Sequence, residues 1–525
     1  MRPFTRIRTD LESTPEREPL LRHPKLATFT CRSTTKTPGG AQADATEDQL
    51  VDVHITPLPR RQLVVLCLMR CTEPISQGLI QPFINRMLED LKVTPERTKI
   101  GLYAGCITSL FAFCQLCTTF WWGRLSDHIG RKPILLSGLT GLSISIISFG
   151  LQTSFVGLVI ARCLAGVMNG NVAVVKSVLA ELTDDTNKAR AFALLPMSGA
   201  LGTIIGPMIG GYLAQPAEQY PELFGNIVFL KAYPYFLPCF IAGLTNLLAV
   251  LLGFFYLEET LESKANKKNK QRQINSDETH GGDSSSSSTD HQSDDQPVDG
   301  PPSLRALFTP TVITVLVSFL FLSIQNSSWA TLIPLFSYTR VEDGGLGLTM
   351  TQIGTALSAN GFVAVLVQMV IFPMLQQKFG TLRLFRGVLL FVPLSFAFLP
   401  LLRYLTLRET NSHGPSQGSK VALYGLMFIL AIKSLTGMGM VCMSLLLNAA
   451  APSKSSFGAL NGLGQSCSAL ARTFGPASAG ALFALSINQH HLGGNLIWVV
   501  AVIVCLCTCV TSWLIRVESS PIKRK

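Results

Sequence analysis

A carboxylate and several cations lie inside stretches of this sequence that are otherwise apolar, and groups of these types could support proton chemistry. Arg70 and Glu73 are three residues apart, which puts both side chains on one face of a helix. Arg162 lies at a similar depth in another apolar stretch. Because ionisable groups are costly in apolar surroundings and are usually functional there, we predict that Glu73 pairs with Arg162 or Arg70 and exchanges a proton. A static pair that fixes helix packing is the competing interpretation.

Lys433 and Arg472 are the corresponding ionisable groups in the second half of the chain. Lys433 has no carboxylate in its own stretch, so it could bind an anionic group, close a gate or pair with a backbone carbonyl. Amide side chains in the apolar stretches are further candidates to line a cavity, although each one alone is more often a helix–helix contact. These candidates are Gln77, Gln81, Gln115, Asn169, Gln325, Asn360 and Gln465.

The composition indicates that the elements carrying these groups cross a membrane. The chain of 525 residues is 48% hydrophobic and 14% charged, whereas soluble domains contain about 25% charged residues. Apolar stretches of about 20 residues, the length that crosses a bilayer, recur along the chain. We predict an all-α polytopic membrane protein with about twelve transmembrane helices in two pseudo-symmetric six-helix bundles. These helices are expected near residues 62–86, 99–122, 133–152, 155–180, 191–214, 234–257, 309–336, 351–374, 384–403, 421–447, 458–486 and 493–515.

Polar segments divide the chain into predicted domains. Residues 1–58 are predicted to be a disordered cytosolic tail, and residues 258–305 a low-complexity cytosolic linker. The linker separates bundles at 59–257 and 306–515, and a basic tail follows at 516–525. Lys and Arg are enriched on the side of the tails and the linker, so both termini are expected to be cytosolic. The net charge of +11 therefore orients a membrane protein and does not indicate nucleic-acid binding.

Two clusters of special residues stand out between and within the predicted helices. The first is the charged loop Gly123–Pro133, in which Gly123 and Gly130 permit close backbone approach or positive φ. In this loop Asp127 can place its charge at a helix N-terminus, while Arg131 and Lys132 mark the cytosolic side. The second cluster predicts close helix packing with a bend, and it comprises Gly202, Gly206, Pro207, Gly210 and Gly211.

The two halves of the sequence repeat each other. The pattern Arg162-x-Leu-x-Gly recurs as Lys433-x-Leu-x-Gly, and Gly206-Pro207 recurs as Gly475-Pro476, at offsets of 271 and 269 residues. The charged loop has a weaker counterpart at 375–380, where Gln377 occupies the place of Asp127. We therefore predict that the first half carries more of a cytosolic gate than the second.

Taken together, residues 60–515 resemble the major facilitator superfamily, in particular its twelve-helix drug:proton antiporter-like branch. The resemblance implies that Asp127 contacts the N-terminus of the eleventh helix and that Arg162 takes part in proton transfer. It also implies that Arg131 pairs with acidic groups, for which Glu181, Asp184 and Glu259 are the candidates. The stretches 181–187, 233–238 and 341–345 are similar to fungal zinc-induced-facilitator-like exporters, including secondary-metabolite-cluster exporters of the psilocybin-pathway type.

The resemblance implies a proton-coupled antiporter that exports a small organic molecule, such as a secondary metabolite or a drug-like compound, by alternating access. Its expected partners are the substrate, protons and the lipid bilayer, and it is expected to be a monomer in the plasma membrane or, alternatively, the vacuolar membrane. Proton-coupled uptake or facilitated transport of a nutrient or metal chelate is the first alternative, and a non-transporting membrane sensor the second. The sequence shows no nucleotide-binding loop, metal-ligand cluster or nucleophile triad, so we expect no enzyme activity, no cofactor and no bound metal.

Overall fold

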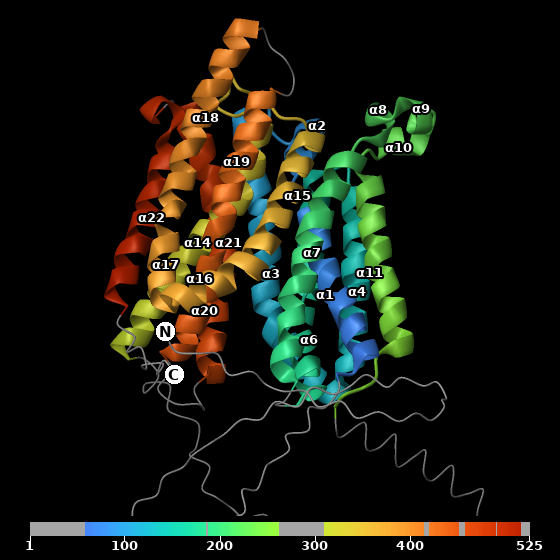
Figure 1. The fold of residues 1–525 in the computed structure, drawn as a ribbon. Coiled ribbons are helices and arrows are strands. Elements are labelled where there is room, and N and C mark those ends of the chain that lie inside the picture. Colours follow the sequence, from blue (N-terminus) through green and yellow to red (C-terminus); the bar gives the residue numbers. More distant parts are fainter. Residues whose placement is uncertain are drawn as a thin grey trace, which may run out of the picture. The chain divides into compact units, whose positions relative to one another are not determined.

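The computed structural model describes residues 58–184, 187–261, 309–413, 419–450, 457–489 and 491–515, all within one compact unit, His54–Lys525. The predicted tails and linker lie almost entirely outside the described residues. Within the described ranges the chain forms helices joined by loops (Figure 1).

The first helix set precedes the linker. It contains α1 (Arg60–Gly78), α2 (Ile84–Asp90), η1 (Arg97–Lys99), α3 (Ile100–Ile129), α4 (Arg131–Gly150), α5 (Phe155–Met168), α6 (Asn171–Glu181), α7 (Lys188–Leu213), α8 (Pro216–Gln219), α9 (Pro221–Phe224), α10 (Val228–Ala232) and α11 (Phe236–Tyr256). The second set follows the linker. It contains α14 (Pro310–Tyr338), α15 (Met350–Leu366), η2 (Val367–Ile371), α16 (Phe372–Phe379), α17 (Thr381–Leu389), α18 (Phe391–His413), α19 (Lys420–Thr436), α20 (Met438–Ala449), α21 (Phe457–Asn488), η4 (His491–Gly494) and α22 (Leu496–Leu514).

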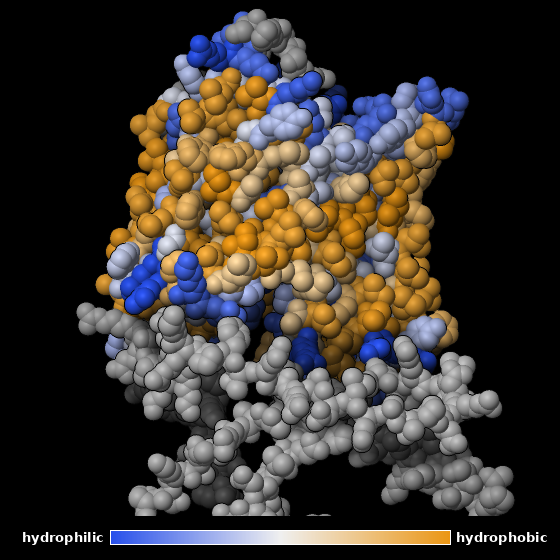
Figure 2. Space-filling view, viewed as in Figure 1, coloured by the Kyte–Doolittle hydropathy of each residue, from blue (hydrophilic) through white to orange (hydrophobic). Residues whose placement is uncertain are grey.

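The prediction of an all-α membrane protein is confirmed. Among the described residues, nine helical stretches are long and apolar enough to cross a membrane. Three further stretches complete the twelve predicted crossings and pack lengthwise against the others: α1, the α5–α6 pair and α21. α1 and α21 are less apolar, because α1 carries Arg70 and Glu73 and α21 is rich in small and polar residues. The α5–α6 pair is apolar but divided into two helices that are each too short to cross alone. Figure 2 shows the broad hydrophobic surface between two hydrophilic ends that a bilayer requires.

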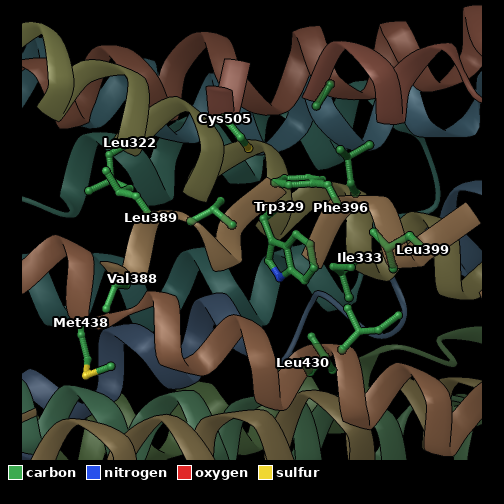
Figure 3. Packing of buried hydrophobic residues seen from close by; sticks show 14 of the residues in the cluster. Leu322, Trp329, Ile333, Val388, Leu389, Phe396, Leu399, Leu430, Met438 and Cys505 are labelled. Carbon is green, nitrogen blue, oxygen red and sulfur yellow. The ribbon is translucent and has the colours of Figure 1, made fainter. Parts of the chain in front are cut away.

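Each helix set has its own hydrophobic core. The largest cluster of buried apolar side chains is drawn entirely from residues 312–515. In it Trp329 of α14 and Phe396 of α18 meet edge to face with ring centroids 4.9 Å apart (Figure 3). The other clusters are built by buried residues of the first set, such as Phe83 and Phe149. Two separate cores allow the sets to move as bodies relative to each other.

The fourth crossing is interrupted at mid-depth. It breaks between α5 and α6, where Asn169 has non-helical backbone angles (φ −89°, ψ 50°). At Gly437, between α19 and α20, the tenth crossing only tightens, because the backbone angles stay helical (φ −57°, ψ −28°). Discontinuous helices are common around the substrate sites of transporters, because their free backbone groups can bind ligands.

We call the face of the molecule that bears the charged loop the motif side, and the other face the opposite side. The helix sets touch along the half of the helices nearer the opposite side. The Ala477 N–H of α21 donates to Ser109 Oγ of α3 at 3.0 Å. Tyr212 of α7 and Thr355 of α15 are hydrogen-bonded at 3.0 Å.

Glycines at the crossing of α3 and α21 show where this contact ends. A Cβ on Gly105 would overlap the carbonyl of Pro476, and a Cβ on Gly480 would overlap that of Gly101. Gly123 and Gly462 lie eighteen residues further toward the motif side on the same helix faces, because 3.6 residues make one turn. No heavy atom of the described residues lies within 4 Å of a Cβ placed at either position. The sets are therefore in contact on the opposite side and apart on the motif side.

Candidate functional site

Glu73 lies in the last third of α1 and holds partners from two helices. Its Oε2 accepts a hydrogen bond from Arg70 Nη1 at 2.9 Å, one helical turn earlier. Its Oε1 accepts from Asn169 Nδ2 at 2.8 Å, at the break between α5 and α6. The Glu73 side chain is 13% exposed. The carboxylate is therefore nearly buried, paired with a cation and attached to an interrupted helix.

The break between α5 and α6 is stabilised by side chains of α3. Gln115 Nε2 donates to the Asn169 carbonyl at 3.1 Å, and Thr118 Oγ1 donates to the Val167 carbonyl at 3.2 Å. Trp122 Nε1 donates to the same Val167 carbonyl at 2.5 Å. Carbonyls freed inside a membrane-spanning segment need such donors, because no lipid group can supply them.

Gly170 lets the Trp122 ring lie against this break, since a Cβ there would overlap the indole. The roles of Thr118, Trp122 and Gly170 were not predicted from the sequence. The dipeptide Asn169-Gly170 is a turn signal that could have located the break.

Arg162 of α5 packs on aromatic rings and forms no ion pair within the described ranges. Its guanidinium lies 4.6 Å from the ring centroid of Phe149 and 5.9 Å from that of Phe111, and the residue is 8% exposed. Arg162 and Glu73 both line a cavity of about 10 Å³. That volume corresponds to about one water molecule. Of the two predicted cation partners of Glu73, Arg70 is thus in direct contact and Arg162 is across this cavity.

Lys433 of α19 lies in the second helix set and is 9% exposed. Its ammonium donates to Asn326 Oδ1 of α14 and to Thr436 Oγ1, each at 2.9 Å. It also lies 5.6 Å from the ring centroid of Trp329. Polar side chains and an aromatic face therefore stabilise the charge without a carboxylate.

Arg472 of α21 is the cation that connects the two sets electrostatically. It lies near the middle of its helix, is solvent-exposed, and interacts electrostatically with Glu73 and Arg70 across the space between the sets. Among the described residues it forms no hydrogen bond or ion pair. The structure thus brings Arg70, Glu73 and Arg472 to one region, and places Lys433 inside the second set.

The charged loop is a compact ion-pair network. Arg131 forms ion pairs with Asp127 at 2.5 Å and with Glu181, at the end of α6, at 3.0 Å. The Glu259 carboxylate accepts from the backbone N–H groups of Arg131 at 2.8 Å and Lys132 at 3.2 Å. Glu259 therefore occupies the N-terminus of α4, a position where the helix dipole favours a negative charge.

The charged loop differs from the prediction in three respects. The acidic group at the nearby helix N-terminus is Glu259 and not Asp127. Glu259 binds backbone groups and not the Arg131 guanidinium. The backbone N–H of Asp184 donates to Asn187 Oδ1 at 3.0 Å, and no ion pair between the Asp184 carboxylate and Arg131 is found. Asp127 itself is 58% exposed and lies on the α3 face that includes Gly123, where the helix sets are apart.

The loop requires a glycine at residue 130 for two reasons. Its φ is +115°, which side chains rarely tolerate, and a Cβ there would lie 2.5 Å from Glu259 Oε2.

The glycines of α7 form two contact surfaces. Three of them face the end of α1. A Cβ on Gly202 would lie 2.5 Å from the Cys71 carbonyl oxygen, and one on Gly206 would lie 2.8 Å from the Ile75 carbonyl oxygen. A Cβ on Gly210 would overlap the carbonyl of Leu79, which follows α1. Gly211 faces α15, where its Cβ would lie 2.9 Å from Gly354 Cα. The glycine-rich stretch therefore lets α7 pack closely against α1 and, through Gly211, against the second helix set.

The amide candidates separate into cavity and packing residues. Gln77 lines the small cavity together with Asn169, Gln465 is exposed, and Gln81 lies in the turn that follows α1. Asn360 accepts a hydrogen bond from Ser434 at 2.8 Å, inside the second set.

The prediction is wrong for Gln325, which is 3% exposed and binds Thr508 and the Val504 carbonyl of α22. Gln115 is likewise buried, and its amide stabilises the break at Asn169. An amide in an apolar helix has to bind a partner, and here a neighbouring helix supplies it.

Comparison with known proteins identifies this arrangement. A family model described as Major Facilitator Superfamily matches residues 66–476. The major facilitator-type transporter psiT2 of Psilocybe cyanescens is 34% identical, over 88% of this chain and 90% of its own length. The major facilitator superfamily multidrug transporter mfsB of Aspergillus fumigatus is 32% identical, over 88% and 84% of the two chains. Protein ZINC INDUCED FACILITATOR 1 of Arabidopsis thaliana is 27% identical, over 80% and 84%.

The fold also matches solved structures of transporters. A bacterial homologue of the human lysosomal transporter Spinster, in an inward-facing and unoccupied conformation, superposes with a TM-score of 0.61. It is 14% identical, and the match covers 88% of this chain and 98% of that one. The resemblance found in the sequence is confirmed by these matches.

Proposed function

This chain belongs to the major facilitator superfamily and is a multi-pass membrane transporter, and we propose that it exports a small organic molecule in exchange for protons. Transport would follow alternating access, in which the two helix sets open toward one side of the membrane at a time. We propose that the protein acts as a monomer in the plasma membrane, with the motif side in the cytosol because Lys and Arg are concentrated there.

The observation that carries the proposal is the position of Glu73. Its carboxylate lies beside the space between the helix sets, paired with Arg70 and within electrostatic range of Arg472. Protonation removes the charge that both Arg70 and Asn169 bind, so one proton changes contacts in α1 and at the break of the fourth crossing. A titratable group at such a position is the element that proton-coupled transport requires.

The conformation is consistent with this proposal. Contact on the opposite side and separation on the motif side correspond to one of the two states of alternating access. The charged loop borders the open side, where Asp127 and Gly123 would meet α21 in the other state.

Two observations favour export over the uptake alternative. The glycine–proline stretch of α7 packs between α1 and α15, as expected for the antiporter branch that the sequence resembles. The relative mfsB is named a multidrug transporter. Uptake of a nutrient or metal chelate is the second candidate function, because a coupled carboxylate serves either direction.

The proposal is tested with inside-out membrane vesicles, which accumulate exported compounds. Vesicles with an acidic interior are incubated with the small-molecule extract of the source organism, and their contents are measured by mass spectrometry. We expect at least one organic compound to accumulate against its gradient and to be lost when a proton ionophore is added.

Glu73→Gln should abolish this accumulation, and Glu222→Gln, in the short helix α9 far from the charge cluster, should not. Accumulation that persists without a pH gradient, or in Glu73→Gln, would refute proton coupling. Accumulation in right-side-out vesicles with an acidic exterior would instead support uptake.

A further inference from the structure

The helix α6 connects the central carboxylate to the charged loop. At its start, the break residue Asn169 donates to Glu73 Oε1 at 2.8 Å. At its end, Glu181 pairs with Arg131 at 3.0 Å and accepts from Thr260 Oγ1 at 2.5 Å. Eleven residues separate these ends as one continuous helix, which spans roughly 16 Å at about 1.5 Å per residue.

The first end of this helix is built as a hinge. Asn169 and Gly170 interrupt the helical hydrogen bonds, and Gln115, Thr118 and Trp122 of α3 stabilise the freed carbonyls. A break whose backbone groups are already satisfied can change its angle without leaving polar groups unpaired in the membrane.

We propose that Asn169 is the positioning residue that transmits the protonation state of Glu73 to α6, and through Glu181 to the charged loop. This inference rests on the proposed proton coupling at Glu73. It assigns to Asn169 a role distinct from binding substrate or carrying the proton.

The chemistry of the amide supports this role. An ionised Glu73 accepts from Arg70 on one oxygen and from Asn169 on the other. When a proton adds to the carboxylate, its charge falls from −1 to 0 and one oxygen becomes a donor. The Asn169 amide then loses a charged acceptor, and such hydrogen bonds are stronger than neutral ones. The angle at the break is thereby linked to the charge on Glu73.

Other charged and titratable groups surround the Glu73–Arg70 pair. Arg70 and Cys71 come from its own helix, Arg162 from α5 across the small cavity, and Arg472 from α21. Lys176 of α6 acts on Arg70 and so on the pair. Asn169 carries no charge. Removing its amide should therefore change how α6 responds to the protonation of Glu73 much more than it changes proton binding itself.

The test uses purified full-length protein in lipid nanodiscs and does not require the substrate. Ser466→Cys provides a reporter, because residue 466 is exposed on the motif-side half of α21, fourteen residues before the contact residue Gly480. Labelling of residue 466 by a membrane-impermeant maleimide is quantified by mass spectrometry between pH 5.5 and 8.5. At each pH it is divided by the labelling of the same residue in unfolded protein, because the thiolate that reacts with maleimide itself becomes scarcer as the pH falls. This ratio is the labelling compared below. Proton uptake on acidification is measured in the same samples with an indicator dye.

In the otherwise unchanged protein we expect labelling to change with pH, and Glu73→Gln should remove that change together with one bound proton. Asn169→Ala should still take up the proton but weaken the pH dependence of labelling about 10-fold or more, as expected for a lost hydrogen bond to a charged group. Asn169→Gln, which retains an amide donor, should keep part of the pH dependence of labelling. The matched control is Asn171→Ala, which removes a buried amide with no hydrogen-bond partner among the described residues, and it should behave like the unchanged protein.

The outcomes separate this inference from the function on which it rests. If no proton uptake depends on Glu73, proton coupling fails and this inference fails with it. If uptake depends on Glu73 but Asn169→Ala labels with the original pH profile, only the role of Asn169 is overturned. If Asn169→Ala and Asn171→Ala weaken the pH dependence of labelling equally, the role of Asn169 is also overturned, because such a result would indicate general damage to the break.

Discussion

Tyr338 at the end of α14 donates a hydrogen bond to Glu89 of α2, so a charged hydrogen bond joins the two helix sets on the opposite side. Glu89 also pairs with Arg97 at 3.0 Å. The adjacent Asp90 accepts from Tyr235 at 2.5 Å. Burial and the Asp90 carboxylate raise the pKa of Tyr235 above its ordinary value, so this hydroxyl stays protonated and continues to donate. Glu89 therefore helps to hold the two sets together on the opposite side, while Asp90 binds residues of its own set.

Tyr338→Phe should weaken this closure. The change removes a hydroxyl that donates to a carboxylate, a bond worth about 1.5 to 3 kcal/mol, or roughly 10- to 150-fold in an equilibrium. Because opening the opposite side closes the motif side, maleimide labelling at residue 466 should slow in Ser466→Cys protein. Tyr404→Phe, at an exposed position on α18, is the control. Unchanged labelling in Tyr338→Phe would mean that the bond does not hold the sets together.

Gly105→Val and Gly123→Val should act on opposite states. A side chain at residue 105 would overlap Pro476 in the closed contact, whereas residue 123 has open space beside it. Overpacking costs about 1 to 3 kcal/mol, or roughly 5- to 150-fold in the balance of states. Labelling at residue 466 should therefore fall in Gly105→Val and stay high in Gly123→Val, while transport falls in both. A change of the same sign in the two variants would contradict the observed geometry.

Asp127→Asn should impair transport much more than Gln377→Ala. Asp127 lies one turn beyond Gly123 and pairs with Arg131, which in turn binds Glu181. Gln377 is exposed and forms no hydrogen bond among the described residues. In inside-out vesicles at matched expression, we expect roughly a 10-fold loss of rate for Asp127→Asn, typical of a coupling between sites, and little change for Gln377→Ala. Equal losses would refute the asymmetry of the two halves.

The helices and one ion pair were predictable because they depend on local pattern. Hydropathy located the crossings, since a bilayer demands apolar stretches of fixed length. The spacing of Arg70 and Glu73 placed them on one helix face, and they are paired at 2.9 Å. These features need no knowledge of which helices are neighbours.

The break at Asn169 and the orientation of Gln325 depend on tertiary neighbours. A hydropathy window averages over the break, and only the donors of α3 show that it is stable. Gln325 sits in an apolar helix like Gln77, yet its amide binds α22 while Gln77 lines a cavity. Sequence spacing could not distinguish the two faces, because both belong to helices surrounded by other helices.

Trp122→Phe should destabilise the break of the fourth crossing. The substitution keeps an aromatic ring against Gly170 but removes the donor to the Val167 carbonyl. Thr118 still donates to that carbonyl at 3.2 Å, so we expect a loss of about 1 kcal/mol in the free energy of unfolding. Trp121→Phe is the matched control, because Trp121 is 64% exposed and forms no hydrogen bond among the described residues.

Combining Trp122→Phe with Thr118→Val leaves the carbonyl of the half-buried Val167 without either donor. The penalty for an unsatisfied buried carbonyl is about 1 to 3 kcal/mol, so the double variant should lose more stability than the sum of the single variants. Thermal unfolding of detergent-solubilised protein measures both effects. Additive losses would show that another group replaces the missing donors, and the break would then need less support from α3 than its geometry indicates.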